Sequence, residues 1–106
     1  METAIAARCL EALGSPTRLE IFRLLVQAGP DGAAVGDLQA KLNIPASTLS
    51  HHCSRLVQVG LVTQQRRGRH LICRADYRRM DALVTYLGEN CCQGLGAEQC
   101  GGSNAA

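Results

Sequence analysis

The feature that most constrains the fold is a pair of helix-forming segments with only the letters "NIP" between them. Apolar residues recur at helical spacing over 35–42 and again over 46–59. Gly60 then favours the end of the second helix. Two helices joined by so short a turn form a helix-turn-helix. The chain must therefore adopt one of the small folds that are built around this motif.

The sequence that follows changes from a helical to a strand-like pattern. Two short runs flank Arg67 and Gly68. In the second run two sets of residues alternate, namely Leu71, Cys73 and Ala75 with His70, Ile72 and Arg74. This pattern predicts a two-stranded β-hairpin with a basic tip, which would form a wing beside the helix-turn-helix.

Further helices are predicted on both sides of these elements. Residues 3–13 form the first, and Ser15 and Pro16 suit the N-cap and first position of a second helix that runs to Ala28. Asp76 suits the N-cap of a last helix. The expected apolar stripes are Ile5, Cys9 and Leu13, then Leu19, Phe22 and Val26, and finally Met80, Leu83, Val84 and Leu87. The predicted fold class is mainly α, a winged helix-turn-helix of about five helices plus a two-stranded wing.

Composition restricts the class of protein further. The 106 residues suit one small domain, and a chain with no Trp, one Phe and two Tyr must build an aliphatic core. No apolar run reaches the ~18 residues of a membrane span, and the N-terminus does not resemble a signal peptide. We therefore expect a cytoplasmic protein, in which six cysteines indicate metal, metalloid or redox chemistry rather than a disulfide framework.

Charge is distributed unevenly along the chain, although the net charge is only +2. The segment from Ala46 to Ala75 has no acidic residue, which suggests a polyanionic partner. Its arginines are Arg55, Arg66, Arg67, Arg69 and Arg74. An ordinary solvated surface is the alternative.

Double-stranded DNA is the partner that this arrangement favours. A helix fits the major groove, which is about 12 Å wide, and an arginine-rich hairpin can reach the flanking backbone. The predicted contacts on the second helix are Ser47, Thr48, Ser50, His51 and Arg55, and those on the hairpin are Arg66, Arg67 and Arg69. Leu49, Cys53 and Leu56 fall on the opposite, core-facing side of the helix.

The glycine-rich C-terminal segment carries three of the six cysteines, Cys91, Cys92 and Cys100. Three thiolates suit a thiophilic ion. Structural zinc usually takes four ligands, and this segment contains neither a histidine nor a fourth cysteine. A trigonal set of three sulfurs suits trivalent arsenic or antimony, although incidental thiols in a mobile tail are the alternative. We expect residues 1–90 to form the DNA-binding and dimerisation domain and 91–106 a flexible tail with the metalloid site.

The remaining cysteines are expected to pack in the core. Cys9, Cys53 and Cys73 each stand alone within an apolar pattern, where a thiol acts as a small hydrophobic group. The run His51, His52 and Cys53 does not predict a metal site, because neighbouring residues on a helix point in different directions.

Three segments together resemble the ArsR/SmtB family of winged-helix metal-sensing repressors: "LGSPTRLEIFRLL", "IPASTLSHHCSRLVQVGLV" and "RRGRHLICRAD". The resemblance implies a homodimer that binds operator DNA when empty and releases it when an inducer binds. It also implies that the first and last helices build the dimer, through residues such as Leu10, Leu13, Leu83 and Leu87.

The sensor sites of this family vary in position, and two of them are not matched here. The arsenic branch resembles "ELCVCDL", whereas this chain reads "GAAVGDL", with Ala34 and Gly36 in place of the thiols. The zinc branch uses Asp and His on the last helix, where this chain has Asp76 and Asp81 but no His. The pattern of a cysteine pair plus one is similar to arsenic repressors whose site lies beyond the last helix.

These observations predict a repressor of an arsenic-resistance operon, not an enzyme and without a permanently bound cofactor. Trivalent arsenic is the expected inducer, as arsenite or a methylated arsenical, with antimony as a further candidate. A redox-sensing repressor of the same fold is also possible, in which Cys9 forms a disulfide with Cys91 or Cys92. A small thiol enzyme and a structural dimerisation module are two further interpretations of the sequence.

Overall fold

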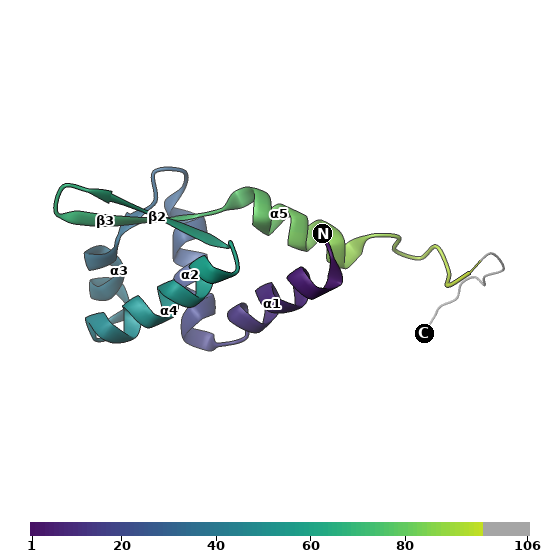
Figure 1. Ribbon diagram of the computed structural model, residues 1–106, viewed down its shortest axis with the longest axis horizontal. Helices are drawn as coiled ribbons and strands as arrows, with labels where there is room; N and C mark the ends of the chain where they lie inside the picture. Colours follow the sequence, from purple (N-terminus) through teal and green to yellow (C-terminus); the bar gives the residue numbers. More distant parts are fainter. Residues whose placement is uncertain (97–106) are drawn as a thin grey trace.

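A computed structural model of the chain describes residues 1–96. Over these residues it has five helices and three strands (Figure 1). In chain order the elements are α1 Thr3–Leu13, α2 Pro16–Ala28, β1 Ala33–Ala34, α3 Val35–Leu42, α4 Ala46–Gln58, β2 Val62–Arg67, β3 His70–Ala75 and α5 Tyr77–Gly88. This order confirms the mainly α winged helix-turn-helix class, with α3 and α4 as the helix-turn-helix and β2–β3 as the wing.

Local sequence sets the start of two helices. The Ser15 hydroxyl accepts a hydrogen bond from the Arg18 backbone amide, and Pro16 occupies the first turn of α2. The Asp76 carboxylate accepts from the Arg79 amide at 3.1 Å and caps α5 in the same way. Both predicted N-caps are therefore confirmed, because capping depends on residues within one turn of the helix start.

The sheet differs from the prediction, which had only two strands. Its order is β1-β3-β2, and β1 pairs with β3 through Ala33 opposite Cys73 and Ala34 opposite Ile72. A two-residue strand has no alternation of its own, and it forms only because β3 offers a free edge for pairing. Gly32 makes this approach possible: it has φ +73°, and a Cβ there would lie 2.2 Å from the Cys73 carbonyl oxygen.

The buried core joins all five helices to the sheet, and on α2 the buried face is partly the predicted one. Phe22 is buried and Val26 half-buried against the core, as predicted, but Leu19 is 44% exposed, whereas Ile21 and Leu25 are buried. Apolar residues crowd this helix so densely that several overlapping stripes have helical spacing, and only the positions of α4 and the sheet select one. The stripe on α1 is centred on buried Cys9, as predicted.

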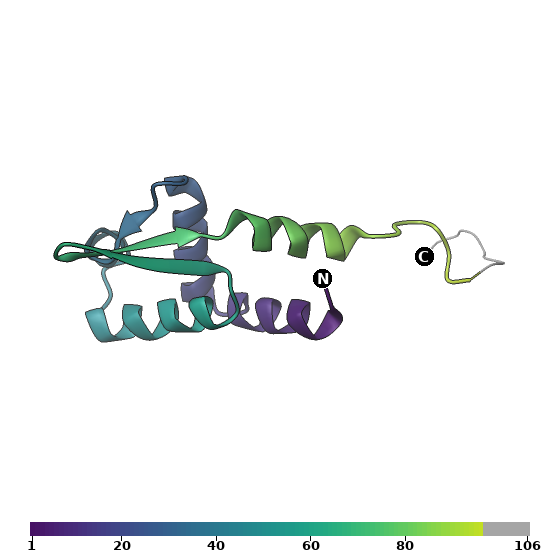
Figure 2. The same cartoon turned by 45° about the horizontal axis from the view of Figure 1, so that its top comes forward.

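Helices α1 and α5 lie side by side and extend away from the wing in both views (Figures 1 and 2). The hydroxyls of Thr3 and Tyr86 are hydrogen-bonded and tie the start of α1 to the end of α5. Helix α5 exposes large apolar side chains to solvent: Val84 is 64% and Leu87 is 60% exposed. No helix within residues 1–96 has the length and apolarity required to cross a bilayer.

Replacing Gly32 should disrupt the contact between β1 and β3. Gly32→Ala would combine a left-handed backbone with a backbone clash, so we expect the free energy of unfolding to fall by about 2 kcal/mol or more. Gly36→Ala is the matched control, because Gly36 lies in α3 with nothing within 4 Å of an added Cβ, and alanine should be neutral or stabilising there. Urea unfolding of both variants measures the difference, and equal stabilities would contradict this account of the sheet.

Candidate nucleic-acid interface and thiol sites

One face of α4 anchors the helix, and the other carries most of the predicted DNA contacts. Leu49, Cys53 and Leu56 are buried, as predicted. Exposed polar side chains occupy the first half of the opposite side, namely Ser47, Thr48, Ser50 and His51. Pro45 precedes the helix, and no side chain within residues 1–96 caps the first backbone amides of α4.

The wing presents its arginines at the same end of the molecule. Arg66, Arg67 and Arg69 are exposed, and within residues 1–96 none of them forms an ion pair. The hairpin turns at Gly68, where φ +59° suits the first position of a two-residue turn. Figure 2 shows the hairpin projecting past the helices on the side where α4 begins. Three cations and a row of hydroxyls therefore lie at one end of the protein.

Arg74, in contrast, has a structural role. Its Nε donates to the Pro30 carbonyl at 3.0 Å, and its Nη1 donates to Gln65 Oε1 at 2.9 Å. The bond to Pro30 holds the loop before β1 against the sheet, and the bond to Gln65 joins β3 to β2.

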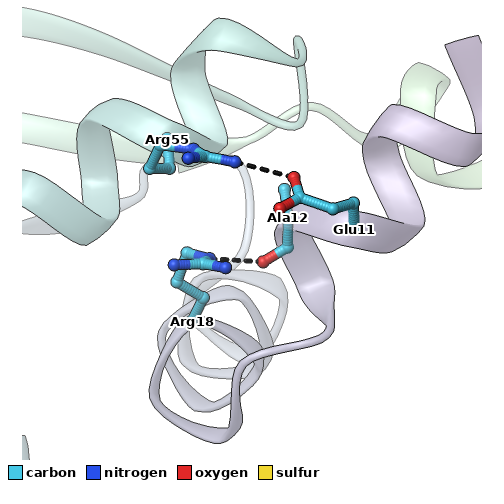
Figure 3. A network of polar contacts seen from close by, with 4 residues as sticks. All are labelled: Glu11, Ala12, Arg18 and Arg55. Carbon is cyan, nitrogen blue, oxygen red and sulfur yellow. Dashed lines mark hydrogen bonds and ion pairs between the residues drawn. The ribbon is translucent and has the colours of Figure 1, made fainter.

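Arg55 is also engaged, although it belongs to the predicted DNA contacts. Its Nη2 lies 2.7 Å from Glu11 Oε1 on α1, and this is the sole ion pair within the described residues (Figure 3). Beside it, the Arg18 Nε donates to the Ala12 carbonyl at the end of α1 (Figure 3). Two arginines, one from α4 and one from α2, therefore hold the end of α1.

The neighbouring histidines of α4 differ in orientation and in burial. The rings of His51 and His52 are 5.8 Å apart and tilted by 59°. The Nδ1 atom of His52 is buried without a hydrogen-bond partner in the described part of the chain, and burial followed by the nearby Arg18 and His51 lowers the pKa of His52. Residues 1–96 contain no cluster of three potential ligands among His, Cys, Asp and Glu.

Cys91 and Cys92 follow α5 and are exposed, with their sulfurs 3.4 Å apart. Neighbouring side chains converge here because the backbone is neither helical nor extended: Asn90 has φ +59° and Cys92 has φ +62°. The segment that follows α5, and that carries this pair, lies at the end of the molecule opposite the wing (Figure 1). The third predicted ligand, Cys100, lies outside the described residues.

Cys9 is placed differently from this pair. It is buried in α1, where its thiol donates to the Val59 carbonyl at 3.6 Å. Burial raises the pKa of Cys9, against the opposing effect of Arg79 and Arg8. Cys9 is therefore poorly reactive in this conformation, and a disulfide with Cys91 or Cys92 would require α1 to expose it.

The two remaining described cysteines lie in the core. Cys53 on α4 and Cys73 on β3 are both buried, as predicted. The Gln64 amide donates to the Cys73 sulfur at 3.3 Å.

Comparison with known proteins agrees with this architecture. The helix-turn-helix domain family matches residues 13–65. A Halobacterium salinarum protein, provisionally named an arsenical resistance operon repressor, ArsR2, is 41% identical over 59 residues, which are 56% of this chain and 49% of that protein. The chain thus spans about half the length of this relative.

Solved structures show the same fold. The ArsR family transcriptional regulator RHA00566 superimposes with a TM-score of 0.71 at 22% identity, over 84% of this chain and 89% of that one. The homodimeric winged helix-turn-helix DNA-binding domain of Mb0332 from Mycobacterium bovis gives 0.64 at 27% identity, over 90% and 89%. The chain belongs to the helix-turn-helix domain family and, within it, to the ArsR/SmtB winged helix-turn-helix regulators.

The ion pair between Arg55 and Glu11 should contribute little to stability. Their side chains are 35% and 65% exposed, so a double-mutant cycle with Glu11→Gln and Arg55→Gln should give a coupling energy of about 0.5 kcal/mol. Urea unfolding at low and at about 1 M salt measures this energy, which should vanish at high salt. The matched cycle of Glu20→Gln with Arg55→Gln should show none. A coupling that persists at high salt would be inconsistent with an exposed pair.

Proposed function

We propose that this protein is a homodimeric transcriptional repressor that binds operator DNA through α4 and the wing and releases it when trivalent arsenic binds the C-terminal thiols. One observation carries the proposal. The exposed face of α4 and the wing arginines, which form no ion pair within residues 1–96, lie at one end of the molecule. The segment after α5, which carries the exposed Cys91–Cys92 pair, lies at the other end (Figure 1).

Successive residues in the first half of α4 would make different DNA contacts. Ser47 and Thr48 lie in the first turn, where free backbone amides and the helix dipole attract a phosphate. Ser50 and His51 follow on the exposed side and can reach base edges in the major groove. The Arg55 guanidinium is occupied by Glu11, so we expect it to hold α4 against α1 before any phosphate contact.

The wing would supply much of the affinity. Each phosphate that an arginine neutralises releases counterions, so binding should weaken steeply with salt. Arg66, Arg67 and Arg69 are available for this role because they form no ion pair within residues 1–96.

A second copy of the chain would cover the apolar side of the α1–α5 pair. Leu10 is 43% exposed and Leu87 60%, which is costly for aliphatic side chains unless a partner covers them. Leu13 is half-buried, and Leu83 is only 5% exposed, so Leu83 supports α5 from inside the protomer. Two protomers joined here would each present a wing and an α4 to successive grooves.

The thiols beyond α5 would form the sensor. Cys91 and Cys92 already place two sulfurs within reach of one ion, and we assign the third position to Cys100 from the sequence. Three soft ligands without a histidine favour arsenic or antimony over zinc. Because the pair follows α5 directly, metalloid binding would act on the proposed dimer helices. A near-complete switch requires the inducer to prefer one conformation by about 5 kcal/mol.

Inducer binding can be tested by fluorescence anisotropy of the full chain on labelled DNA from its own promoter. We expect arsenite to release the DNA, and the variants Cys91→Ser, Cys92→Ser and Cys100→Ser to require at least about tenfold more arsenite. Gln93→Ser, a neighbouring change that keeps every thiol, is the control.

Parallel titrations identify the ligand class. Antimonite and a monomethylated trivalent arsenical should also act, and the methylated form, which needs two thiols, should remain effective on Cys100→Ser. Release by peroxide with no response to arsenite would instead support a redox sensor, and zinc alone would contradict the three-sulfur site. The assignment would be wrong if all three serine variants responded at wild-type arsenite levels.

The wing can be tested separately on the inducer-free protein. Arg67→Gln should weaken DNA binding about tenfold at low salt and reduce the slope of log affinity against log salt by about 1. Arg23→Gln is the control, since Arg23 is exposed on α2 outside the proposed interface. Equal effects of the two substitutions would show that charge, rather than wing position, determines binding.

A further inference from the structure

Among the predicted DNA contacts, only Arg55 forms an ion pair or a side-chain hydrogen bond within residues 1–96. Its Nη2 lies 2.7 Å from Glu11 Oε1, and the two side chains, one from α4 and one from α1, point toward one another (Figure 3). Ser47, His51 and Arg55 nevertheless follow at intervals of four residues, so they lie along the same side of α4. Arg55 therefore belongs both to the proposed DNA face and to the joint with α1.

The contact between the two charged groups is easy to exchange. It joins one guanidinium nitrogen to one carboxylate oxygen, and the side chains are 35% and 65% exposed. Water and salt screen such a pair, which changes an equilibrium only about twofold. A guanidinium can bind a phosphate through two parallel hydrogen bonds, which is a stronger arrangement. A phosphate within reach could therefore replace Glu11 as the partner of Arg55.

DNA bound along α4 would bring such phosphates close. A helix in the major groove has a sugar–phosphate backbone along each edge of the groove, and most protein–DNA hydrogen bonds go to that backbone. Arg55 lies one turn beyond His51, and its long side chain can turn from Glu11 to a phosphate without movement of the α4 backbone. The exchange would leave Glu11 as an unpaired negative charge near the DNA, which opposes binding.

We propose that Glu11 competes with the DNA backbone for Arg55, so that the ion pair of the free protein lowers the affinity of the repressor for its operator. Each protomer must break its own pair on binding. A homodimer therefore loses about fourfold in affinity, which is about twofold from each protomer. This inference rests on the proposed function, since it requires DNA binding through α4.

The position of Glu11 on α1 connects this competition with the helices of the proposed dimer. Helix α1 packs against both α4 and α5, and the hydroxyls of Thr3 and Tyr86 join it to the end of α5. The segment that carries Cys91 and Cys92 follows α5. A displacement of α1 that strengthened the pair between Glu11 and Arg55 would weaken DNA binding without any change in the wing.

The test is a double-mutant cycle in DNA binding, measured by fluorescence anisotropy of the full chain on labelled DNA from its own promoter at low salt. We expect Glu11→Gln to bind about fourfold more tightly than the wild type. Arg55→Gln should bind more weakly and reduce the slope of log affinity against log salt, because a phosphate contact is lost. The double variant should bind as Arg55→Gln does, because Glu11 acts only through Arg55.

Glu20→Gln is the matched control, because it removes the same charge from an exposed position of α2. It should leave the affinity for DNA unchanged. The direction of the Glu11 effect separates competition from a structural role, since loss of a contact that merely supports α4 would weaken DNA binding rather than strengthen it. Urea unfolding of each variant checks that the fold is retained.

Each contrary outcome overturns the proposal for a stated reason. Equal or weaker binding by Glu11→Gln would exclude competition, and the same gain in Glu20→Gln would show an effect of net charge alone. A gain that persisted in the double variant would mean that Glu11 repels DNA directly, and an unchanged salt slope in Arg55→Gln would mean that Arg55 meets no phosphate. Wild-type protein that bound no promoter DNA would overturn the proposed function itself, and the competition with it.

Discussion

The burial of one face of α4 is the contact on which the rest of the structure depends. Leu49, Cys53 and Leu56 are each at most 1% exposed, so this amphipathic helix is fixed in rotation as well as in position. The rotation decides which residues face outward, and these are the serines, the threonine and His51. Most of its stability comes from packing, since a helix of 13 residues is marginal alone in water.

The positive charge of the protein is also arranged around α4. The hairpin after α4 carries arginines that repel one another, and within residues 1–96 no carboxylate forms an ion pair with them. Glu11 instead pairs with Arg55, nearer to the α1–α5 pair. The protein therefore keeps unneutralised positive charge where a polyanion would bind and places its ion pair at the joint between α4 and α1. The wing contacts proposed for DNA and the ion pair within the protomer therefore use different arginines.

Sequence patterns predicted the features that depend on near neighbours. The caps at Ser15 and Asp76, the inward face of α4 and the hairpin all follow from a few adjacent residues. The features that the sequence did not predict depend on how distant elements pack together. Strand β1 exists only because β3 has a free edge, and the ion pair between Arg55 and Glu11 links segments distant in the chain.

The described thiols fall into two classes, exposed and buried, which differ in what can react with them. Cys91 and Cys92 are exposed and adjacent, so a thiophilic ion can reach both without disturbing the fold. Cys53 and Cys73 are enclosed in the packed core, where a thiol acts as a small hydrophobic group. Exposure therefore separates the thiols that the proposed metalloid could reach from those that contribute to the core.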